Sequence, residues 1–597
     1  MRDPAKTRAL VACCGFVFCF TLFSARLVHL QVTKRDEYTA KAAEKHTNKE
    51  AISARRGVIE DVHGEPLAQN EPIRTVIADG SLIDVADRAG MAALLAKPLG
   101  LSEALLLEKL STEREVKDGA EKKTAPSRYI VLKKKVPESV ASEITLALSE
   151  NKLRGIHFEP DSERRYPNGE MLCHVVGYVN NYNTGVEGIE RNLDAYLRGH
   201  AGFRSVERDR TGKELVAFRG QERAPRNGFT VRLTIDMGLQ QIVEAELDAA
   251  CKQFRPKMAC VILMRPQTGE ILALANRPNF DPNVIEDSPE AARRNRAITD
   301  MVEPGSTFKI VTTAAALSQN LVNRNSYIFC ENGAFLWGGK TLHDHRAYGD
   351  LSVEELLVHS SNIGVAKLGI QLGPQRLYDA VRKFGFGERT GVNLPGEISG
   401  IVHPVNVWSQ VSITHVPMGQ EVAATPLQVV TAMGAIANGG SLMMPQIVHS
   451  ITDEDGNVVQ SMQKTEVRRV ATPEAIAIVR DALVQVVSKK GTAPLAHVVG
   501  YNVAGKTGTA QKASPEGGYE RGKHVVSFVG FMPAEAPEFV ALVMLDEPQT
   551  KPEQNYGGMI AAPVFSRIGE KAARYLNLTP TVEEQATSEM ITQVFRD

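Results

Sequence analysis

The stretch Gly500–Ala510, GYNVAGKTGTA, matches two motifs that belong to different folds. One motif is G-x-x-x-x-G-K-[ST], which runs from Gly500 to Thr507 and cradles phosphates between a strand and a helix. The other is K-T-G, at Lys506-Thr507-Gly508, which accompanies a serine nucleophile in acyl-transfer enzymes. The two motifs predict different structures after Thr507, so the residues that follow decide the fold.

The residues after Thr507 favour a strand over the helix that a phosphate loop opens. Gly508-Thr509 is a poor helix start, because glycine is among the least favourable helix residues. A parallel sheet also needs a crossover of a dozen or more residues, usually a helix. Residues 511–538 supply instead a loop rich in Gly and Pro and a strand, and FVALVMLDE (539–547) supplies another. Asp546-Glu547 resembles a magnesium-binding strand end, but we interpret it as a solvated acid pair within an antiparallel meander.

A serine and a lysine upstream supply the nucleophile and base that accompany K-T-G. EPGSTFK contains Ser306 and Lys309 in the order S-x-x-K, directly after the turn-forming Pro304-Gly305. Residues three apart on a helix share a face, so Lys309 can reach the Ser306 hydroxyl. A serine hydroxyl is a weak nucleophile until a base takes its proton, and lysine acts as a base only when its pKa falls well below about 10.4. Burial and a second cation, Lys506, would lower that pKa.

Two further motifs follow in the chain. Ser360 and Asn362 form S-x-N, in which the serine hydroxyl can relay a proton and the asparagine amide can hold a peptide group. Lys506-Thr507-Gly508 and Thr509 form a strand suited to binding a carboxylate, and its glycine leaves room for a peptide alongside. S-x-x-K alone is a common chance match, but the ordered set of three motifs indicates a serine acyl-transfer enzyme.

Length and composition bound the class of protein. A chain of 597 residues is too long for one hydrophobic core, so about two to four domains are expected. Its 69 basic and 70 acidic residues nearly cancel, which argues against a nucleic-acid partner. The seven cysteines include no C-x-x-C pair with metal-ligand spacing, so we expect no zinc site.

The N-terminus predicts a membrane anchor. No residue from Ala9 to Ala25 is charged, and after Arg26 the apolar pattern continues to Val32. A helix of this length rises about 25–36 Å, enough to span a bilayer core of about 30 Å. Basic residues precede it, so the tail is expected to stay in the cytoplasm. We favour an anchor over a cleaved signal peptide because no A-x-A-like site ends the run, and the rest of the chain is then extracytoplasmic.

The pattern of the whole chain predicts an α+β protein with two main folded domains. Residues 1–8 are expected to form a cytoplasmic tail, 9–32 the transmembrane helix and 33–228 a membrane-proximal α+β domain. Residues 229–575 are expected to form a domain of helices around an antiparallel sheet, followed by a C-terminal tail, 576–597.

Five shorter segments carry expectations of their own. Arg55–Ala68 is predicted to form a strand and hairpin, and Ser111–Ser127 a charged loop. Arg223–Asp236 is interpreted as a linker between the two domains. His343–Arg346, HDHR, resembles a metal-binding pair, but its setting favours a polar turn near the cleft. Arg164-Arg165 is expected to form surface or interdomain salt bridges.

With these motifs, the chain resembles the class B penicillin-binding proteins, which are peptidoglycan D,D-transpeptidases. NRAITDMVEPGSTFK, GQEVAATPLQ and VAGKTGTAQ resemble blocks of their catalytic domain. RGVIED, at Arg56–Asp61, and GVEGIERNLDAYLRG, at Gly185–Gly199, resemble elements of their membrane-proximal domain. Val62-His63 departs from the Arg-Asn or Arg-Asp that the family often has there, which affects a hairpin and leaves the chemistry untouched. The resemblance covers the chain from the anchor to about Tyr575.

The resemblance implies a β-lactamase-like penicillin-binding transpeptidase domain on an elongated pedestal or dimerisation domain. It also implies that the nucleophile attacks the penultimate D-Ala carbonyl of a stem peptide, releases the terminal D-Ala and passes the acyl group to a neighbouring amine. β-Lactams would acylate the same serine, and no metal or organic cofactor is required. The implied catalytic residues are Ser306, Lys309, Ser360, Asn362 and Lys506, and the implied substrate-binding and oxyanion residues are Thr507, Gly508 and Thr509.

Within the family, EPGSTFK, FSARLVHLQV at the anchor and RTVIADGSLI resemble the septal, FtsI-like group more than the elongation group, in which PPGSTFK is usual. A septal role implies a SEDS-family glycosyltransferase and other divisome proteins as partners, stem peptides on lipid-linked or nascent glycan as substrate, and the bacterial inner membrane as location. An elongation-type transpeptidase is the alternative within the family. A membrane-anchored β-lactamase or β-lactam sensor would share S-x-x-K and K-T-G, and a silent scaffold would have lost a motif residue.

Overall fold

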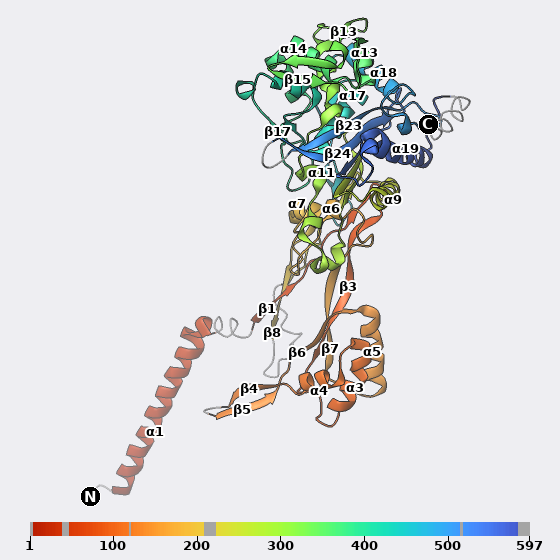
Figure 1. Ribbon diagram of the computed structural model, residues 1–597. Coiled ribbons are helices and arrows are strands. Elements are labelled where there is room, and N and C mark those ends of the chain that lie inside the picture. The colour runs from red at the N-terminus through yellow and green to blue at the C-terminus, as the bar shows by residue number, and fades with distance from the viewer. Residues whose placement is uncertain (1–3, 39–46, 119–120, 208–221, 514–517, 583–597) are drawn as a thin grey trace. The chain divides into compact units, whose positions relative to one another are not determined.

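The computed structural model describes residues 4–38, 47–118, 121–207, 222–513 and 518–582 (Figure 1). The chain divides into two compact units. One unit comprises Met1–Arg55 and Arg198–Gly228, and the other comprises Arg56–Leu197 and Phe229–Asp597. Most of the expected C-terminal tail, 576–597, and the first residues of the expected N-terminal tail, 1–8, lie outside the described residues.

The smaller unit contains the N-terminal helix and a short sheet. α1 spans Pro4–Val28 and continues into a π-helical turn, His29–Thr33. Arg8–Thr33 is 26 residues long and apolar enough to cross a membrane, and at 1.5 Å per residue it rises about 39 Å. The sheet consists of β1 (Thr47–Ile52), β8 (Gly202–Glu207) and β9 (Glu222–Arg223), paired antiparallel in this order. By length and composition, the helix fits a single-pass anchor.

Residues 56–197 of the larger unit form a lobe of strands and helices. Its strands are β3 (Pro66–Ala78), β6 (Ile130–Pro137) and β7 (Ile156–Arg165), and its main helices are α3 (Arg88–Leu99), α4 (Glu103–Leu110) and α5 (Glu138–Glu150). β3 lies between β6 and β7 and pairs antiparallel with both. Met91, Leu95 and Ile144 are fully buried in an apolar core that belongs to this lobe alone.

The segment Ser111–Ser127, predicted to be a charged loop, instead contains a β-hairpin. β4 (Glu113–Asp118) and β5 (Glu121–Pro126) pair antiparallel over their whole length. The prediction was wrong because a run of charges indicates exposure to solvent, and an exposed two-stranded ribbon can still pair the backbone groups that face each other.

The sheet of the lobe extends into the residues that follow position 228. Its strand order is β21-β20-β10-β2-β3-β6, and β2 (Ile59–Glu60) continues as a hairpin into β3, as predicted. β10 (Thr230–Leu233) pairs parallel with β2 and antiparallel with β20 (Val448–Thr452), which pairs with β21 (Val458–Ser461). The predicted linker therefore contains a central strand. Val231 and Leu233 are fully buried there, a short alternation that the surrounding Arg, Pro and Gly residues obscured.

A buried cluster of charged side chains stabilises the lobe. Arg56 Nε and Arg164 Nε donate to the two carboxylate oxygens of Glu190, at 2.6 and 2.7 Å. Arg56 also donates through Nη1 to Asp194 Oδ1 at 2.7 Å. The side chains of Arg56 and Glu190 have no exposed surface, and that of Arg164 is 2% exposed. The predicted surface or interdomain salt bridge at Arg164 is therefore wrong, because both partners are buried inside one lobe.

A five-stranded antiparallel sheet forms the centre of the residues after the lobe. Its order is β12 (Ile271–Arg277), β11 (Met258–Met264), β25 (Phe539–Asp546), β24 (Tyr519–Met532) and β23 (Ala504–Ala513). β23, β24 and β25 form the predicted antiparallel meander. Because β23 continues through Ala513, the residues after Thr507 form a strand and not the helix of a phosphate loop.

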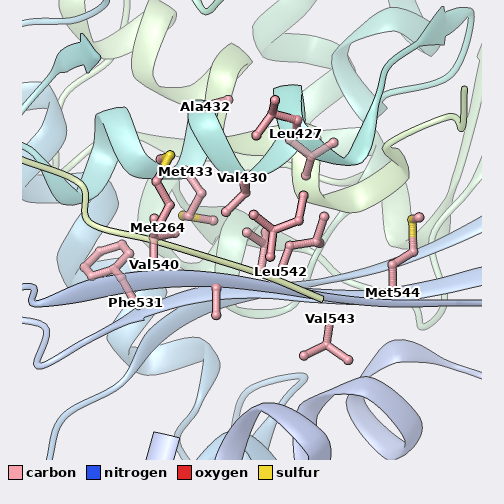
Figure 2. Close-up of a cluster of buried hydrophobic side chains, with 14 of the residues drawn as sticks. Met264, Leu427, Val430, Ala432, Met433, Phe531, Val540, Leu542, Val543 and Met544 are labelled. Atoms are coloured by element: carbon pink, nitrogen blue, oxygen red, sulfur yellow. The ribbon is translucent and has the colours of Figure 1, made fainter. Parts of the chain in front are cut away.

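Helices cover both faces of this sheet (Figure 1). α17 (Pro426–Ala437) packs on one face, and α9 (Met237–Phe254) and α19 (Gly557–Tyr575) pack on the other. Figure 2 shows Val540 and Leu542 of β25 on the side of α17 and Val543 on the opposite side. Because both faces are covered, every residue of β25 is buried.

The acid pair at the end of β25 is not the solvated pair that the sequence predicted. Asp546 is 5% exposed, and Lys512 of β23 donates to Asp546 Oδ2 and to Glu547 Oε1, both at 2.8 Å. Lys257 also pairs with Glu547, at 2.8 Å. Pairing through β24 brings the lysine of β23 within reach of the carboxylates, a long-range contact that local sequence does not reveal.

Several helices gather around α12 (Lys309–Ser318), in which every residue from Lys309 to Leu317 is buried. They are η4 (Gly305–Phe308), α13 (Val353–Val358), α14 (Asn362–Leu372), α15 (Pro374–Lys383), η7 (Val416–Met418) and α18 (Pro473–Val486), and α16 (Ser412–His415) packs against α14. Four two-stranded ribbons complete this region: β13 (Tyr327–Phe329) with β16 (Asp350–Ser352), β14 (Ala334–Trp337) with β15 (Lys340–His343), β17 (Ile401–Val402) with β18 (Val422–Ala423), and β19 (Ser441–Met443) with β22 (Glu466–Arg469).

Replacing Glu190 by alanine is expected to lower the free energy of unfolding by about 3–5 kcal/mol, because Arg164 would stay buried without its counter-charge and Arg56 would keep only Asp194. Thermal and urea unfolding of the detergent-solubilised chain would measure this loss. Glu163→Ala is the matched control, because Glu163 pairs with Lys135 at 2.8 Å while 41% exposed, and its loss should cost about 1 kcal/mol or less. Equal losses in the two variants would contradict a structural role for the buried cluster.

Candidate active site

Ser306 lies on a tight turn directly before a helix. η4 contains Ser306, and α12 begins immediately after η4 at Lys309. Gly305 adopts a left-handed conformation, with φ of 55°, and its N–H donates to Gly419 O at 3.2 Å. The Ser306 side chain is half-buried. The structure therefore places Ser306 about one turn before Lys309 and close to a helix start, as the sequence predicted.

Lys309 is the centre of a buried polar cluster. The residue has no exposed surface, and its Nζ donates to Ser360 O at 2.5 Å, to Ser360 Oγ at 3.1 Å and to Asn362 Oδ1 at 2.7 Å. These contacts match the three N–H donors of a lysine ammonium; a neutral amine has two N–H donors and a lone pair, and in that form the Ser360 hydroxyl can donate to Nζ. S-x-x-K and S-x-N, which are separate in the sequence, therefore meet at one amine.

The S-x-N segment is held in a conformation that few residues adopt. Ser360 has φ of 57°, in the left-handed region that non-glycine residues rarely enter. Ser361 is the N-cap of α14, and its hydroxyl accepts the N–H of Gly364 at 3.0 Å. Asn362 is the first residue of α14. The sharp turn at Ser360 therefore presents both its carbonyl and its hydroxyl to Lys309, with the Asn362 side chain beside them.

Asp344 fixes this segment, and sequence analysis did not assign it to the site. Asp344 Oδ2 accepts the Ser361 hydroxyl at 2.7 Å, and Oδ1 accepts the N–H of Asn362 at 2.5 Å and of Ile363 at 3.1 Å. The neighbouring His343 O accepts Asn362 Nδ2 at 2.9 Å. HDHR was singled out as a polar turn near the cleft, but only the fold shows that its aspartate binds the start of α14. An acid at a helix N-terminus is also favoured by the helix dipole.

Lys506 lies on β23 as a buried and unpaired amine. The residue has no exposed surface, and no hydrogen-bond acceptor among the described residues lies within reach of its Nζ. Burial lowers the pKa of Lys506 to about 7. A buried amine without a partner is costly, and a bound anion would lower that cost. Lys506 is therefore suited to binding a carboxylate that enters from outside.

Alternation along β23 separates the residues of its K-T-G motif. A Cβ at Gly508 would lie 3.0 Å from Thr307 Cγ2 and 2.3 Å from Ser527 Oγ, so no side chain fits beside the turn that carries Ser306. The Thr507 and Thr509 hydroxyls lie on the other face, where they are 3.2 Å from Thr492 Oγ1 and from the N–H of Gly557 respectively.

The edge of β23 is open to an extended substrate. The Thr509 hydroxyl accepts a hydrogen bond from the backbone N–H of Gly557, where α19 begins, and Thr509 is exposed. A hydroxyl that accepts one hydrogen bond can still donate another. β23 is the last strand of the sheet order, which leaves its outer edge as the place where an extended peptide could pair. The backbone of β23, the Lys506 amine and the Thr509 hydroxyl therefore remain available to a substrate.

The electrostatics of the site favour a neutral lysine. Burial, and then the charge of Lys506, hold the pKa of Lys309 well below its usual value, while the negative charge of Asp344 opposes this shift. A lowered pKa favours the neutral amine, and a neutral lysine can take a proton from a hydroxyl. The arrangement can therefore generate a serine nucleophile without a histidine.

The described part of the chain contains no group of three or more His, Cys, Asp or Glu side chains that could hold a metal ion. The described residues therefore give no support to a metal-binding role for HDHR, at His343–Arg346.

Comparison with protein families gives two matches along the chain. The model described as Penicillin binding protein transpeptidase domain matches residues 259–570. The model described as Penicillin-binding Protein dimerisation domain matches residues 51–233.

Individual relatives cover nearly the whole chain. Stage V sporulation protein D of Bacillus subtilis is 33% identical over 94% of this chain and 85% of its own length. Peptidoglycan D,D-transpeptidase FtsI of Escherichia coli is 31% identical over 95% of this chain and 92% of its own length.

Solved structures agree with these matches. Penicillin Binding Protein 2X from Streptococcus thermophilus superposes with a TM-score of 0.75 and 25% identity, over 88% of this chain and 80% of that chain. Penicillin binding protein 3 from Mycobacterium tuberculosis, complexed with aztreonam, superposes with a TM-score of 0.67 and 27% identity, over 90% of this chain and 99% of that chain. The predicted α+β architecture of two domains, the second a penicillin-binding transpeptidase domain, is confirmed.

Replacing Lys506 by glutamine is expected to shift the acid limit of acylation by a penicillin to higher pH. The Lys506 charge lowers the pKa of Lys309, so its removal raises that pKa, and the neutral base then forms only at higher pH. Acylation rates measured from about pH 5 to 10 would show the shift. Lys512→Gln is the control, because Lys512 lies on the same strand but pairs with Asp546. An unmoved limit in the Lys506 variant would contradict the coupling of the two lysines.

Proposed function

The chain belongs to the class B penicillin-binding proteins, the peptidoglycan D,D-transpeptidases, and we propose that Ser306 is the nucleophile of its acyl-transfer reaction. The observation that carries this proposal is the buried Lys309 amine, which Ser360 and Asn362 hold beside a second buried lysine, Lys506. This arrangement supplies a neutral base one turn from a half-buried serine. The roles of all eight site residues are proposals of the same kind.

In the first proposed step, neutral Lys309 takes the proton of the Ser306 hydroxyl, and Ser306 Oγ attacks the carbonyl carbon of the penultimate D-Ala of a stem peptide. The backbone N–H groups of Ser306 and Thr509 stabilise the oxyanion that forms. The Oγ–C bond forms and the peptide C–N bond breaks. The proton returns through the Ser360 hydroxyl to the departing D-Ala amine.

Substrate binding uses the residues around this centre. We propose that the Asn362 amide holds a peptide group of the donor and that Lys506 pairs with its terminal carboxylate. Thr507 and Gly508 supply the strand beside which the peptide lies, and the glycine keeps the approach to Ser306 open. The unpaired Lys506 amine supports this assignment, because a substrate carboxylate would complete its hydrogen bonding.

In the second proposed step, the amine of a neighbouring stem peptide attacks the acyl-enzyme ester. Ser360 and Lys309 take its proton and return one to Ser306 Oγ, so the serine is regenerated as the crosslink forms. A β-lactam follows the first step only, because its leaving amine stays tethered to the acyl group. These steps use neither a metal ion nor an organic cofactor.

We also propose a septal role, with a SEDS-family glycosyltransferase and other divisome proteins as partners. Similarity to the protein named FtsI and the EPGSTFK sequence before α12 support this role. The apolar α1 supports an anchor in the inner membrane, with the N-terminus in the cytoplasm and the enzyme outside it. We propose these boundaries: cytoplasmic tail 1–8, transmembrane helix 9–32, membrane-proximal domain 33–228, transpeptidase domain 229–575 and C-terminal tail 576–597.

A fluorescent penicillin is expected to label the wild-type chain stably and to leave Ser306→Ala unlabelled on a denaturing gel, over a time course. The same pair of proteins, incubated with lipid-linked peptidoglycan precursor and a glycosyltransferase, should differ in D-Ala release and in crosslinked product. A band that forms and decays within seconds would indicate a β-lactamase, and equal labelling of the variant would exclude Ser306 as the nucleophile.

Depletion of the protein from its source bacterium is expected to block septation and give filaments, because septal crosslinks would be missing while the side wall still grows. Re-expression of the wild-type chain should restore division, and Ser306→Ala should not. Loss of cell elongation with septation intact would contradict the septal role and favour an elongation enzyme. A fluorescent fusion at midcell would provide independent support.

A further inference from the structure

Glu303, which lies directly before the turn of Ser306, joins three segments of the chain. Its Oε1 accepts the backbone N–H of Glu421 at 2.9 Å. The Tyr519 hydroxyl donates to its Oε2 at 3.1 Å and lies 3.3 Å from Oε1. Burial raises the pKa of Glu303, and the hydrogen bonds from Glu421 and Tyr519 counteract that rise. None of the sequence motifs assigns a role to this carboxylate.

The segment that contains Glu303 and the segment that contains Glu421 run side by side like two short strands. Val302 and Ala424 exchange two backbone hydrogen bonds of 2.9 Å, and Gly305 N donates to Gly419 O at 3.2 Å. Between these points, the Glu303 carboxylate takes the N–H of a residue with φ of 60°, Glu421. The turn that carries Ser306 is therefore fixed to the segment 419–424 on both sides of Glu303.

Tyr519 brings the third segment to this point. It is the first residue of β24 and lies opposite Ala513 at the far end of β23. β23 also carries Thr509, whose N–H is the second donor of the proposed oxyanion hole. The Tyr519–Glu303 hydrogen bond therefore links the hairpin that carries one donor to the turn that carries the other.

The two elements also touch near the donors themselves. A Cβ built on Gly305 would lie 3.4 Å from Ala510 Cβ and 3.6 Å from Thr509 O, so the turn packs against β23 without a side chain between them. An oxyanion hole works only when both N–H groups lie about 2.7–3.1 Å from one oxygen atom. A small increase in the distance between the turn of Ser306 and β23 would disrupt that geometry while leaving both elements folded.

We propose that Glu303 is a positioning residue that, through Tyr519, holds the turn of Ser306 and strand β23 at the separation the oxyanion requires. The inference rests on the proposed function, because it concerns the donors of the acyl-transfer site. Glu303 touches neither substrate nor the reacting atoms. It acts through the spacing of two backbone N–H groups, and it should therefore affect the rate of acylation and not the binding of the ligand.

Tyr519→Phe removes the link and retains the ring. Stopped-flow acylation of the full chain in detergent by a chromogenic cephalosporin would give the acylation rate constant and the noncovalent Kd separately. We expect the rate constant to fall about tenfold, less than the 10²–10³ that loss of a whole oxyanion donor costs. The Kd should stay within about twofold, and the melting temperature should stay close to wild type.

Tyr575→Phe is the matched control for this variant. The Tyr575 hydroxyl also donates to a carboxylate, Asp236 Oδ1 at 2.8 Å, and Tyr575 is 43% exposed against 41% for Tyr519. That contact joins the end of α19 to the residue before α9, behind the sheet. The control should acylate at the wild-type rate.

Substitutions of Glu303 test the same link from its other end. Glu303→Gln keeps one acceptor oxygen and should retain part of the rate, whereas Glu303→Ala loses both contacts and should be slower. The double variant Glu303→Ala/Tyr519→Phe should be no slower than Glu303→Ala alone, because the shared hydrogen bond is already absent. This non-additivity is a signature that two independent structural defects would not give.

Several results would overturn the proposal. They are a wild-type rate constant in Tyr519→Phe, an equal slowing in Tyr575→Phe, additive effects in the double variant, or a change in Kd with an unchanged rate constant. Failure of the proposed function is a different result: the wild-type chain would not be acylated, or Ser306→Ala would be acylated equally. Ser306-dependent acylation that ignores Tyr519 would overturn the positioning role of Glu303 and nothing else.

Discussion

The proposed site depends on one buried amine, Lys309, whose role as a base requires its neutral form. Its partners are a backbone carbonyl, a hydroxyl and an amide oxygen, and none of these three groups carries a charge. A carboxylate in direct contact would favour the ammonium form and remove the base. Asp344 instead bonds to the backbone and hydroxyl of the S-x-N segment, so its charge reaches Lys309 only at a distance. Asp344 therefore positions the S-x-N segment without forming an ion pair with Lys309.

The fold around this amine is organised to keep water out and distances fixed. α12 is buried from Lys309 to Leu317 and packs against α14, which begins at Asn362 of the S-x-N motif. The five-stranded sheet, covered on both faces, carries the K-T-G motif on its edge strand, β23. Left-handed residues occur around the proposed nucleophile, at Gly305, Ser360 and Glu421. Glycine adopts this conformation freely, and hydrogen bonds of neighbouring groups hold it at Ser360 and Glu421.

Local sequence patterns were enough to predict the parts of the site that depend on spacing and alternation. The turn at Ser306, the meander of β23 to β25 and the meeting of S-x-x-K with S-x-N follow from short motifs and from the chemistry that they share. Contacts between segments distant in sequence were not predictable in this way. Asp344 at the start of α14, Arg164 in a buried charge cluster and Lys512 beside Asp546 all depend on tertiary packing. Thr509 lies on the predicted strand, whereas the contact of its hydroxyl with the N–H of Gly557 depends on α19, which begins 48 residues later in the chain.

The central position of β10 has a consequence for recombination between the genes of related enzymes. β10 pairs on one edge with β2, from the lobe before residue 198, and on the other with β20, from beyond residue 447. Ile59 lies opposite Val231, and Glu60 opposite Arg232, with Arg232 Nη2 3.1 Å from Glu60 Oε2. A recombination event that exchanged only the penicillin-binding half between two related genes would place a foreign strand in this register. Viable mosaics should therefore have crossover points that keep both partners of β10 from the same parent.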